Sequence, residues 1–268
     1  MAGHPLAGSW AKVDRARENL DALDHGARIF QQRHPYAFAF DERADTGHNT
    51  VYLRTERVPL RLSAIAGDVL HDLRSALDNL AWQLVTAEGY QGQKPGFHTK
   101  FPIYGDKGNF RNDVVSRSPK RSPGPLTGLD PAGPIWALIT SEQPYHRPDP
   151  EKSVLGLLQS FSNLDKHRVL MPAGSIADLD VQRMVRWSDN AVLVSQWFNT
   201  QITIPLEHTT ELARLEFDPS GPKPNVHVQG GAILHVAFGE DDRQVTVPDF
   251  DSMRVAVSTL LDKFDQFF

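Results

Sequence analysis

The sequence has no cysteine among its 268 residues, and this absence excludes several kinds of chemistry at once. Disulfides, zinc–thiolate sites, iron–sulfur clusters and thiol nucleophiles all require cysteine. The chain also lacks a strong excess of charge of either sign, because its formal net charge is only −5 at neutral pH. This balance argues against a generally basic, nucleic-acid-binding surface, but it leaves room for a local basic patch.

Long apolar runs are missing as well. No stretch approaches the roughly 20 apolar residues that a membrane helix needs, and the first residues lack the basic start and apolar stretch of a secretion signal. We therefore expect a cytoplasmic protein that does not enter a membrane. The sequence motifs of nucleotide phosphate loops, serine esterases and zinc proteases are also missing, and we expect no metal and no cofactor.

Helical periodicity is the strongest pattern that is present. Apolar residues recur at intervals of three and four, as they do along amphipathic helices, over residues 10–30, 62–87, 154–164 and 250–264. A short helix is predicted to begin at Asp130-Pro131, because aspartate caps helices and proline favours their first turn. The glycine and proline residues of 88–134 predict an irregular connection, interrupted by a strand-like segment at 101–104.

The period changes to two in other regions. Residues 36–40 and 51–53 flank a turn-like segment, and this predicts a β-hairpin. Short alternating segments predict an antiparallel meander over 181–187, 192–198, 202–206, 212–217, 226–228, 233–238 and 245–247. We expect an α+β protein with a mainly helical portion, 1–172, that carries the hairpin, and a portion, 173–268, that holds the antiparallel sheet and a terminal helix. The two portions form either two domains or one continuous domain.

A first polar cluster lies in the predicted helix 62–87. Its leucines face one side, while His71, Asp78 and Trp82 lie nearly opposite and Arg74 lies at the border. Trp82 indicates a second buried face, packed against another part of the chain or against a second subunit of a twofold dimer. Arg74 and Asp78 are spaced for a surface ion pair. Alternatively, they form a site with His71, in which arginine binds phosphate and histidine transfers a proton.

A second polar cluster, Asp165-Lys-His-Arg168, follows the apolar residues of the predicted helix 154–164. Cations in the last turn of a helix interact favourably with its negative end and with its free carbonyl groups. Four consecutive ionisable residues exceed what capping needs, however, and an aspartate beside a histidine can fix its tautomer. If the two helices are neighbours, we expect both clusters to share one cleft.

These clusters also carry a family resemblance. The ordered landmarks resemble those of a group of uncharacterised bacterial and phage proteins over roughly residues 55–172, and they are Leu70–Leu84, Phe101-Pro-Ile103, Gln143-Pro-Tyr145 and Asn163–Arg168. The first landmark is similar to the arginine, short gap and histidine of HEPN-type helical ribonucleases and RNA-binding proteins. The resemblance implies RNA as a partner, metal-independent RNA cleavage, a role in phage defence or stress, and an active site shared across a homodimer.

The match to HEPN departs at one position. Arg74 corresponds to the family arginine, but Asn79 stands where histidine is expected, and an amide cannot exchange protons at neutral pH. Cleavage would then depend on His71 or His167. The candidate catalytic residues are His71, Arg74, Asp78 and His167, and the candidate substrate-binding residues are Asn79, Asp165, Lys166 and Arg168.

Two other functions remain open. In one, the chain is a non-enzymatic structural or interaction protein, and both clusters are buried salt-bridge networks. In the other, it binds a small ligand on the β-sheet near His227 and His235, which have no third metal ligand at a suitable spacing. The basic stretch 111–121 is either a phosphate contact or a solvated loop.

Overall fold

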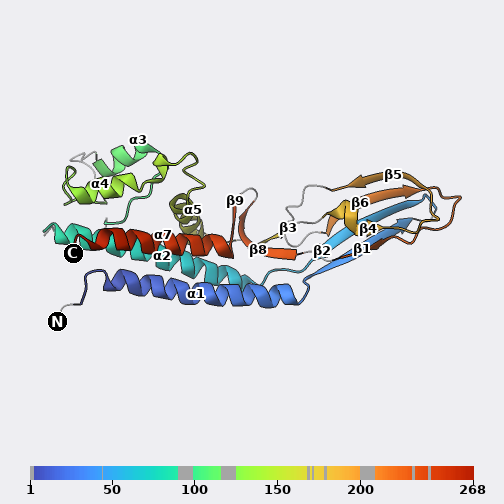
Figure 1. Cartoon of the computed structure of the whole chain (residues 1–268), viewed down its shortest axis with the longest axis horizontal. Coiled ribbons are helices and arrows are strands. Elements are labelled where there is room, and N and C mark those ends of the chain that lie inside the picture. The colour runs from blue at the N-terminus through green and yellow to red at the C-terminus, as the bar shows by residue number, and fades with distance from the viewer. Residues whose placement is uncertain are drawn as a thin grey trace. The chain divides into compact units, whose positions relative to one another are not determined.

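The computed structural model describes residues 3–43, 45–89, 99–115, 125–167, 170, 172–177, 180–199, 209–230, 233–240 and 243–268. The chain divides into two compact units (Figure 1). The helical unit comprises Met1–Leu23, Ser63–Leu170 and Val247–Phe268, and the sheet unit comprises Asp24–Leu62 and Met171–Thr246. The α+β class expected from the sequence is confirmed. The hairpin clusters with the C-terminal strands, and the terminal helix clusters with the earlier helices.

Four long helices dominate the helical elements: α1 (Ala7–Gln32), α2 (Leu60–Ala87), α5 (Val154–His167) and α7 (Val247–Asp265). The shorter elements between α2 and α5 are α3 (Lys107–Phe110), the π-helical turn η2 (Arg111–Val115), α4 (Pro134–Ser141) and the 3-10 turn η3 (Pro144–His146). The long helices cover the four segments predicted from apolar spacing. No helix of the described residues is long and apolar enough to cross a bilayer.

The core of the helical unit is built around α2. The leucine stripe predicted from the sequence is buried, and its members include Leu70, Leu73, Leu77, Leu80 and Leu84. α5 packs against α7. The Phe264 ring of α7 meets the Phe101 ring edge-on, with their centroids 6.2 Å apart. Burial of such large side chains supplies most of the stabilisation of the unit.

The sheet unit contains a four-stranded antiparallel sheet of order β1-β2-β6-β5. Its strands are β1 (Tyr36–Arg43), β2 (His48–Thr55), β5 (Leu193–Phe198) and β6 (Thr209–Phe217). The predicted hairpin β1–β2 is therefore part of a larger sheet, because β2 also pairs with β6. Gly47 closes the hairpin with a positive φ of 71°, and a Cβ there would overlap the carbonyl oxygen of Phe217. A glycine is required at this turn.

The remaining strands form two smaller antiparallel sheets. β8 pairs with β3 and β9, while β4 pairs with β7. Their bounds are β3 (Pro172–Ala177), β4 (Val185–Arg186), β7 (His227–Val228), β8 (Ile233–Glu240) and β9 (Arg243–Thr246). Strand β3 was not anticipated from the sequence.

Three local predictions were wrong. The segment 101–104, expected to be strand-like, belongs to no strand, because side chains bind its backbone groups in place of a neighbouring strand. Residues 181–187 begin with a helical turn, α6 (Val181–Met184), because the side chain of Asp180 accepts a hydrogen bond from the amide of Arg183. The helix expected at Asp130-Pro131 begins at Pro134, since Asp130 closes a turn with the amide of Ala132 instead. The predicted strand 202–206 lies outside the described residues.

Candidate functional site

Arg74 lies at the centre of a polar network inside the helical unit. The residue is only 7% exposed. Its Nη2 donates to the carbonyl oxygen of Phe101 at 2.5 Å and lies 2.9 Å from Oδ1 of Asp78, while its Nη1 donates to Oε1 of Gln159 at 3.1 Å. The expected pair of Arg74 and Asp78 is present, but it is not a surface pair, because the arginine is buried. Three acceptors therefore occupy the guanidinium.

The same network holds both polar groups of one peptide residue. Oδ1 of Asp78 accepts a hydrogen bond from the amide of Phe101 at 3.0 Å, while Arg74 binds the carbonyl of the same residue. Burial lowers the pKa of Arg74, and the neighbouring Asp78 opposes this shift. Phe101 belongs to no strand, so these side chains replace the backbone partners that a sheet would supply.

Gln143 extends the network along the segment 101–104. It is fully buried, and its Nε2 donates to the carbonyl oxygens of Pro102 and Ile139, each at 3.0 Å. Its Oε1 accepts from the amide of Tyr104 at 3.1 Å. We call Arg74, Asp78, Gln143 and Gln159, with the backbone of 101–104, the Arg74 network. Three of the four sequence landmarks, Leu70–Leu84, Phe101–Ile103 and Gln143–Tyr145, thus meet in one buried arrangement.

The fourth landmark contacts α2 about two helical turns before Arg74. Asp165 of α5 lies against Gly67 of α2, where a Cβ would overlap its Oδ1. Burial raises the pKa of Asp165, nearby Asp68 raises it further, and His71 lowers it. The two sequence clusters therefore do approach each other, at His71 and Asp165. We call His71, Asp68, Ser75, Asp165 and Lys166 the His71 face.

The His71 face is accessible to solvent. His71, Asp68 and Lys166 are exposed, while Ser75 and Asp165 are half-buried. Nε2 of His71 lies 3.5 Å from Oγ of Ser75, one helical turn away. Such a contact is at the outer limit of a hydrogen bond.

The remaining predicted residues are placed as follows. Asn79 is exposed, and its Nδ2 lies near Gly8 of α1, 3.9 Å from the position of a Cβ there. His167 is the last residue of α5, but its side chain lies outside the described part of the chain, as does all of Arg168. The structure thus pairs Asp78 with Arg74, and it places Asp165 against Gly67, within electrostatic range of His71.

No family model, curated protein or solved structure matches this chain. The resemblance to HEPN-type proteins stays a prediction from short landmarks.

The two histidines considered as a ligand site, His227 and His235, occupy different sheets. His227 is half-buried in β7, where its Nδ1 lies 3.3 Å from the carbonyl oxygen of Asn225. His235 pairs in register with Ser175 in the sheet of β3 and β8, and its side chain lies outside the described residues. Within the described residues, no group of three or more histidine or carboxylate side chains is arranged to hold a metal ion.

Sequence reasoning missed two groups with clear structural roles. Gln159 and Gln143 are uncharged and were not selected, although Gln143 stands in a landmark. Asp72 is buried on the other side of α2, where it accepts hydrogen bonds from Lys12 at 2.9 Å and from Asn19 at 3.3 Å. An aspartate between the buried Leu70 and Leu73 of an apolar helix was the available signal for this contact between α1 and α2.

Proposed function

We propose that the chain is a non-enzymatic interaction protein and that the Arg74 network is its structural frame. The observation that supports this proposal best is the engagement of the Arg74 guanidinium by Phe101, Gln159 and Asp78. A buried arginine with this set of partners fixes the position of an irregular segment against two helices.

A phosphate role for Arg74 would carry a large cost. Phe101 is fully buried. To reach an RNA phosphate, the guanidinium would have to break its hydrogen bond with the carbonyl oxygen of Phe101. An unpaired buried acceptor costs about 1–3 kcal/mol, and the same movement would leave Asp78 without its cation. These costs favour a frame over a ligand contact.

RNA assays on the intact chain test this proposal. Wild-type protein is incubated with single-stranded and hairpin RNA, and both cleavage and retention by the protein are measured. The proposal expects no cleavage. RNA cleavage that is lost in His71→Ala, while the melting temperature of that variant stays unchanged, would contradict it.

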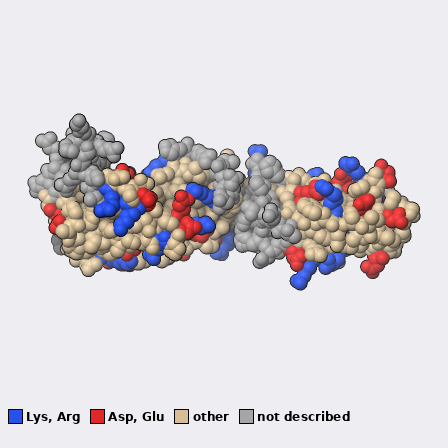
Figure 2. All heavy atoms as spheres, turned by 90° about the horizontal axis from the view of Figure 1, so that it is seen from above, with Lys and Arg blue, Asp and Glu red and all other residues tan. Residues whose placement is uncertain are grey.

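A second candidate function is RNA binding or metal-independent RNA cleavage of the HEPN kind at the His71 face, in phage defence or a stress response. The electrostatic interaction between His71 and Asp165 supports this second candidate, because it joins residues of the two clusters on a surface that solvent reaches. Lys166, which follows Asp165 in α5, is exposed and basic. The carboxylates of Asp68 and Asp165 oppose a polyanion there. On the face seen in Figure 2, basic and acidic side chains are interspersed.

Charge variants separate the two candidates. Lys166→Gln and His71→Ala should weaken RNA retention if this face binds RNA, whereas Arg17→Gln on the exposed side of α1 is a matched control. Equal RNA retention by the wild-type protein and all three variants would reject the hypothesis that the His71 face binds RNA. The homodimer implied by the HEPN resemblance would be detected by light scattering on the same samples.

A further inference from the structure

A cleft of about 600 Å³ lies in the helical unit between α7 and the segment that leads from the end of α4 into α5. One wall is a single face of α7, formed by Ala256, Thr259, Leu260 and Lys263. The other wall contains Pro144, Pro148 and the start of α5 at Val154 and Leu155. This volume falls within the range of small-molecule sites, about 300–1,000 Å³. The cleft does not include the Arg74 network or the His71 face.

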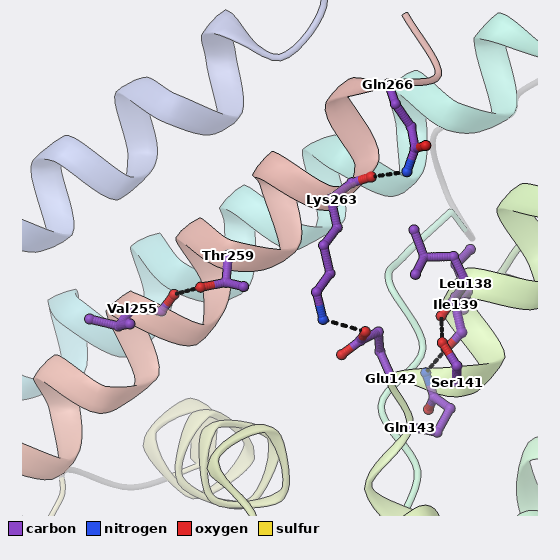
Figure 3. Close-up of polar contacts among 9 residues, drawn as sticks. All are labelled: Leu138, Ile139, Ser141, Glu142, Gln143, Val255, Thr259, Lys263 and Gln266. Carbon is purple, nitrogen blue, oxygen red and sulfur yellow. Dashed lines mark hydrogen bonds and ion pairs between the residues drawn. The ribbon is translucent and has the colours of Figure 1, made fainter.

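Most of the charged groups around the cleft already have partners. Lys263 reaches from α7 to Glu142 and lies 2.6 Å from its Oε1 (Figure 3). Lys152 lies 3.4 Å from Oδ2 of Asp149, in a pair that is largely exposed. Thr259 donates its hydroxyl hydrogen to the carbonyl oxygen of Val255. Because of these pairs, the residues that line the cleft carry no excess of acid.

One cation that lines the cleft, Arg147, has no partner of opposite charge among the residues that the structure describes. Its side chain is exposed to solvent. A guanidinium presents two parallel N–H donors that match a carboxylate. Because Glu142 and Asp149 balance the other two cations, Arg147 provides the cleft with one uncompensated positive charge. A ligand with a single negative charge complements it.

The walls define the rest of the ligand. Pro144, Leu155, Ala256 and Leu260 offer apolar surface, and an apolar group that leaves water to cover them gains free energy in proportion to the area buried. We propose that this cleft binds a small amphipathic carboxylate, with its apolar body between α7 and α5 and its carboxylate on Arg147. This site goes beyond the proposed structural frame and does not depend on it.

Isothermal titration calorimetry on the whole chain tests the proposal with three probes. Octanoate carries both the apolar body and the charge, octanamide carries the body alone, and acetate carries the charge alone. We expect octanoate to bind at least about tenfold more tightly than octanamide, because a charge-assisted pair is lost in the amide. Acetate should show no measurable binding.

Variants locate the site. Arg147→Gln should weaken octanoate binding about tenfold and leave octanamide binding unchanged, whereas Arg17→Gln on α1 should change neither. Ala256→Phe should fill the cleft and abolish binding. Its control is Val255→Phe, which adds a similar volume at the next position of α7, where the side chain is 48% exposed and lies outside the cleft. Thr259→Trp is a second blocking variant at an exposed position.

Three results would overturn the proposal. The first is the absence of octanoate binding to wild-type protein. The second is equal affinity for octanoate and octanamide, which would remove the role of Arg147. The third is octanoate binding that survives in folded Ala256→Phe and Thr259→Trp proteins, which would place the ligand elsewhere. RNA assays and the stability of Arg74 variants do not bear on any of these outcomes, so the structural frame is tested separately.

Discussion

Replacement of Arg74 by alanine should destabilise the helical unit strongly. The substitution removes the donors to Phe101 and Gln159, and each acceptor left unpaired in the interior costs about 1–3 kcal/mol. Gln159 is half-buried, so water replaces part of its bond. The Asp78 side chain is 36% exposed, and its pair with arginine should therefore contribute only about 0.5 kcal/mol. We expect a total loss of about 2–4 kcal/mol.

Thermal unfolding followed by the helical circular dichroism signal measures this loss. For a domain of this size, about 2–4 kcal/mol corresponds to a fall in melting temperature of roughly 5–15 °C. Asp24 and Arg28 of α1 form a matched exposed pair, with Nη2 of Arg28 2.6 Å from Oδ2 of Asp24. Arg28→Ala should cost less than about 0.5 kcal/mol.

The reasoning would be refuted if Arg74→Ala were no more destabilising than Arg28→Ala. A second comparison examines the other half of the network. Asp78→Asn keeps an oxygen that can accept the Phe101 amide hydrogen, whereas Asp78→Ala does not. The alanine variant should therefore be the less stable of the two, and equal melting temperatures would show that this bond contributes little.

Three further predictions concern α2 and its neighbours. Gly67→Ala should lower the melting temperature because its Cβ meets Asp165, although alanine favours helices over glycine by about 1 kcal/mol. Gly67→Ala combined with Asp165→Ala should recover the lost stability. If it does not, the contact between the two residues is rejected. The pKa of Asp165 is raised in the folded state, so its ionisation should destabilise the fold as pH rises through and above the ordinary aspartate range. In urea unfolding, Asp165→Asn should therefore be more stable than wild type at neutral pH, and this difference should disappear in acid. A difference that does not change with pH would contradict the shift. Asp72→Ala should cost about 1–3 kcal/mol by removing the acceptor of Lys12 and Asn19, whereas Asp14→Ala on the exposed side of α1 should be nearly neutral in the same urea experiment.

Helical periodicity predicted much of the helical unit because burial of a continuous apolar stripe leaves a direct trace in the sequence. The segment 62–87 is the clearest case, and its leucines are buried as expected. Strand partners leave a weaker trace. The pairing of β2 with β6 joins residues far apart in the sequence, and neither strand encodes its partner in its own alternation. The hairpin was therefore predicted, but its place in a larger sheet was not.

The sequence indicated two side chains of the Arg74 network, Arg74 and Asp78, but not Gln143 or Gln159. Polar residues in an apolar helix indicated that Arg74 and Asp78 have partners, and the structure supplies those partners. One acceptor for Arg74 is a backbone carbonyl, that of Phe101, and no side-chain pattern identifies such a group. The approach of Asp165 to α2 depends on a glycine, Gly67, whose importance appears only when α5 is placed beside it.

The helical unit is assembled from three separate stretches of the chain, and this has a consequence for how the protein folds. During translation, α7 emerges only after every residue of the sheet unit has been made. Phe264, which packs against Phe101, is therefore absent from the nascent chain at the stage when α1, α2 and α5 have already been made and their apolar core residues are incompletely buried. Non-local contacts of this kind slow folding and expose apolar surface in the nascent chain. A fragment that stops after the sheet strands should consequently aggregate, whereas the whole chain closes its core as the last helix arrives.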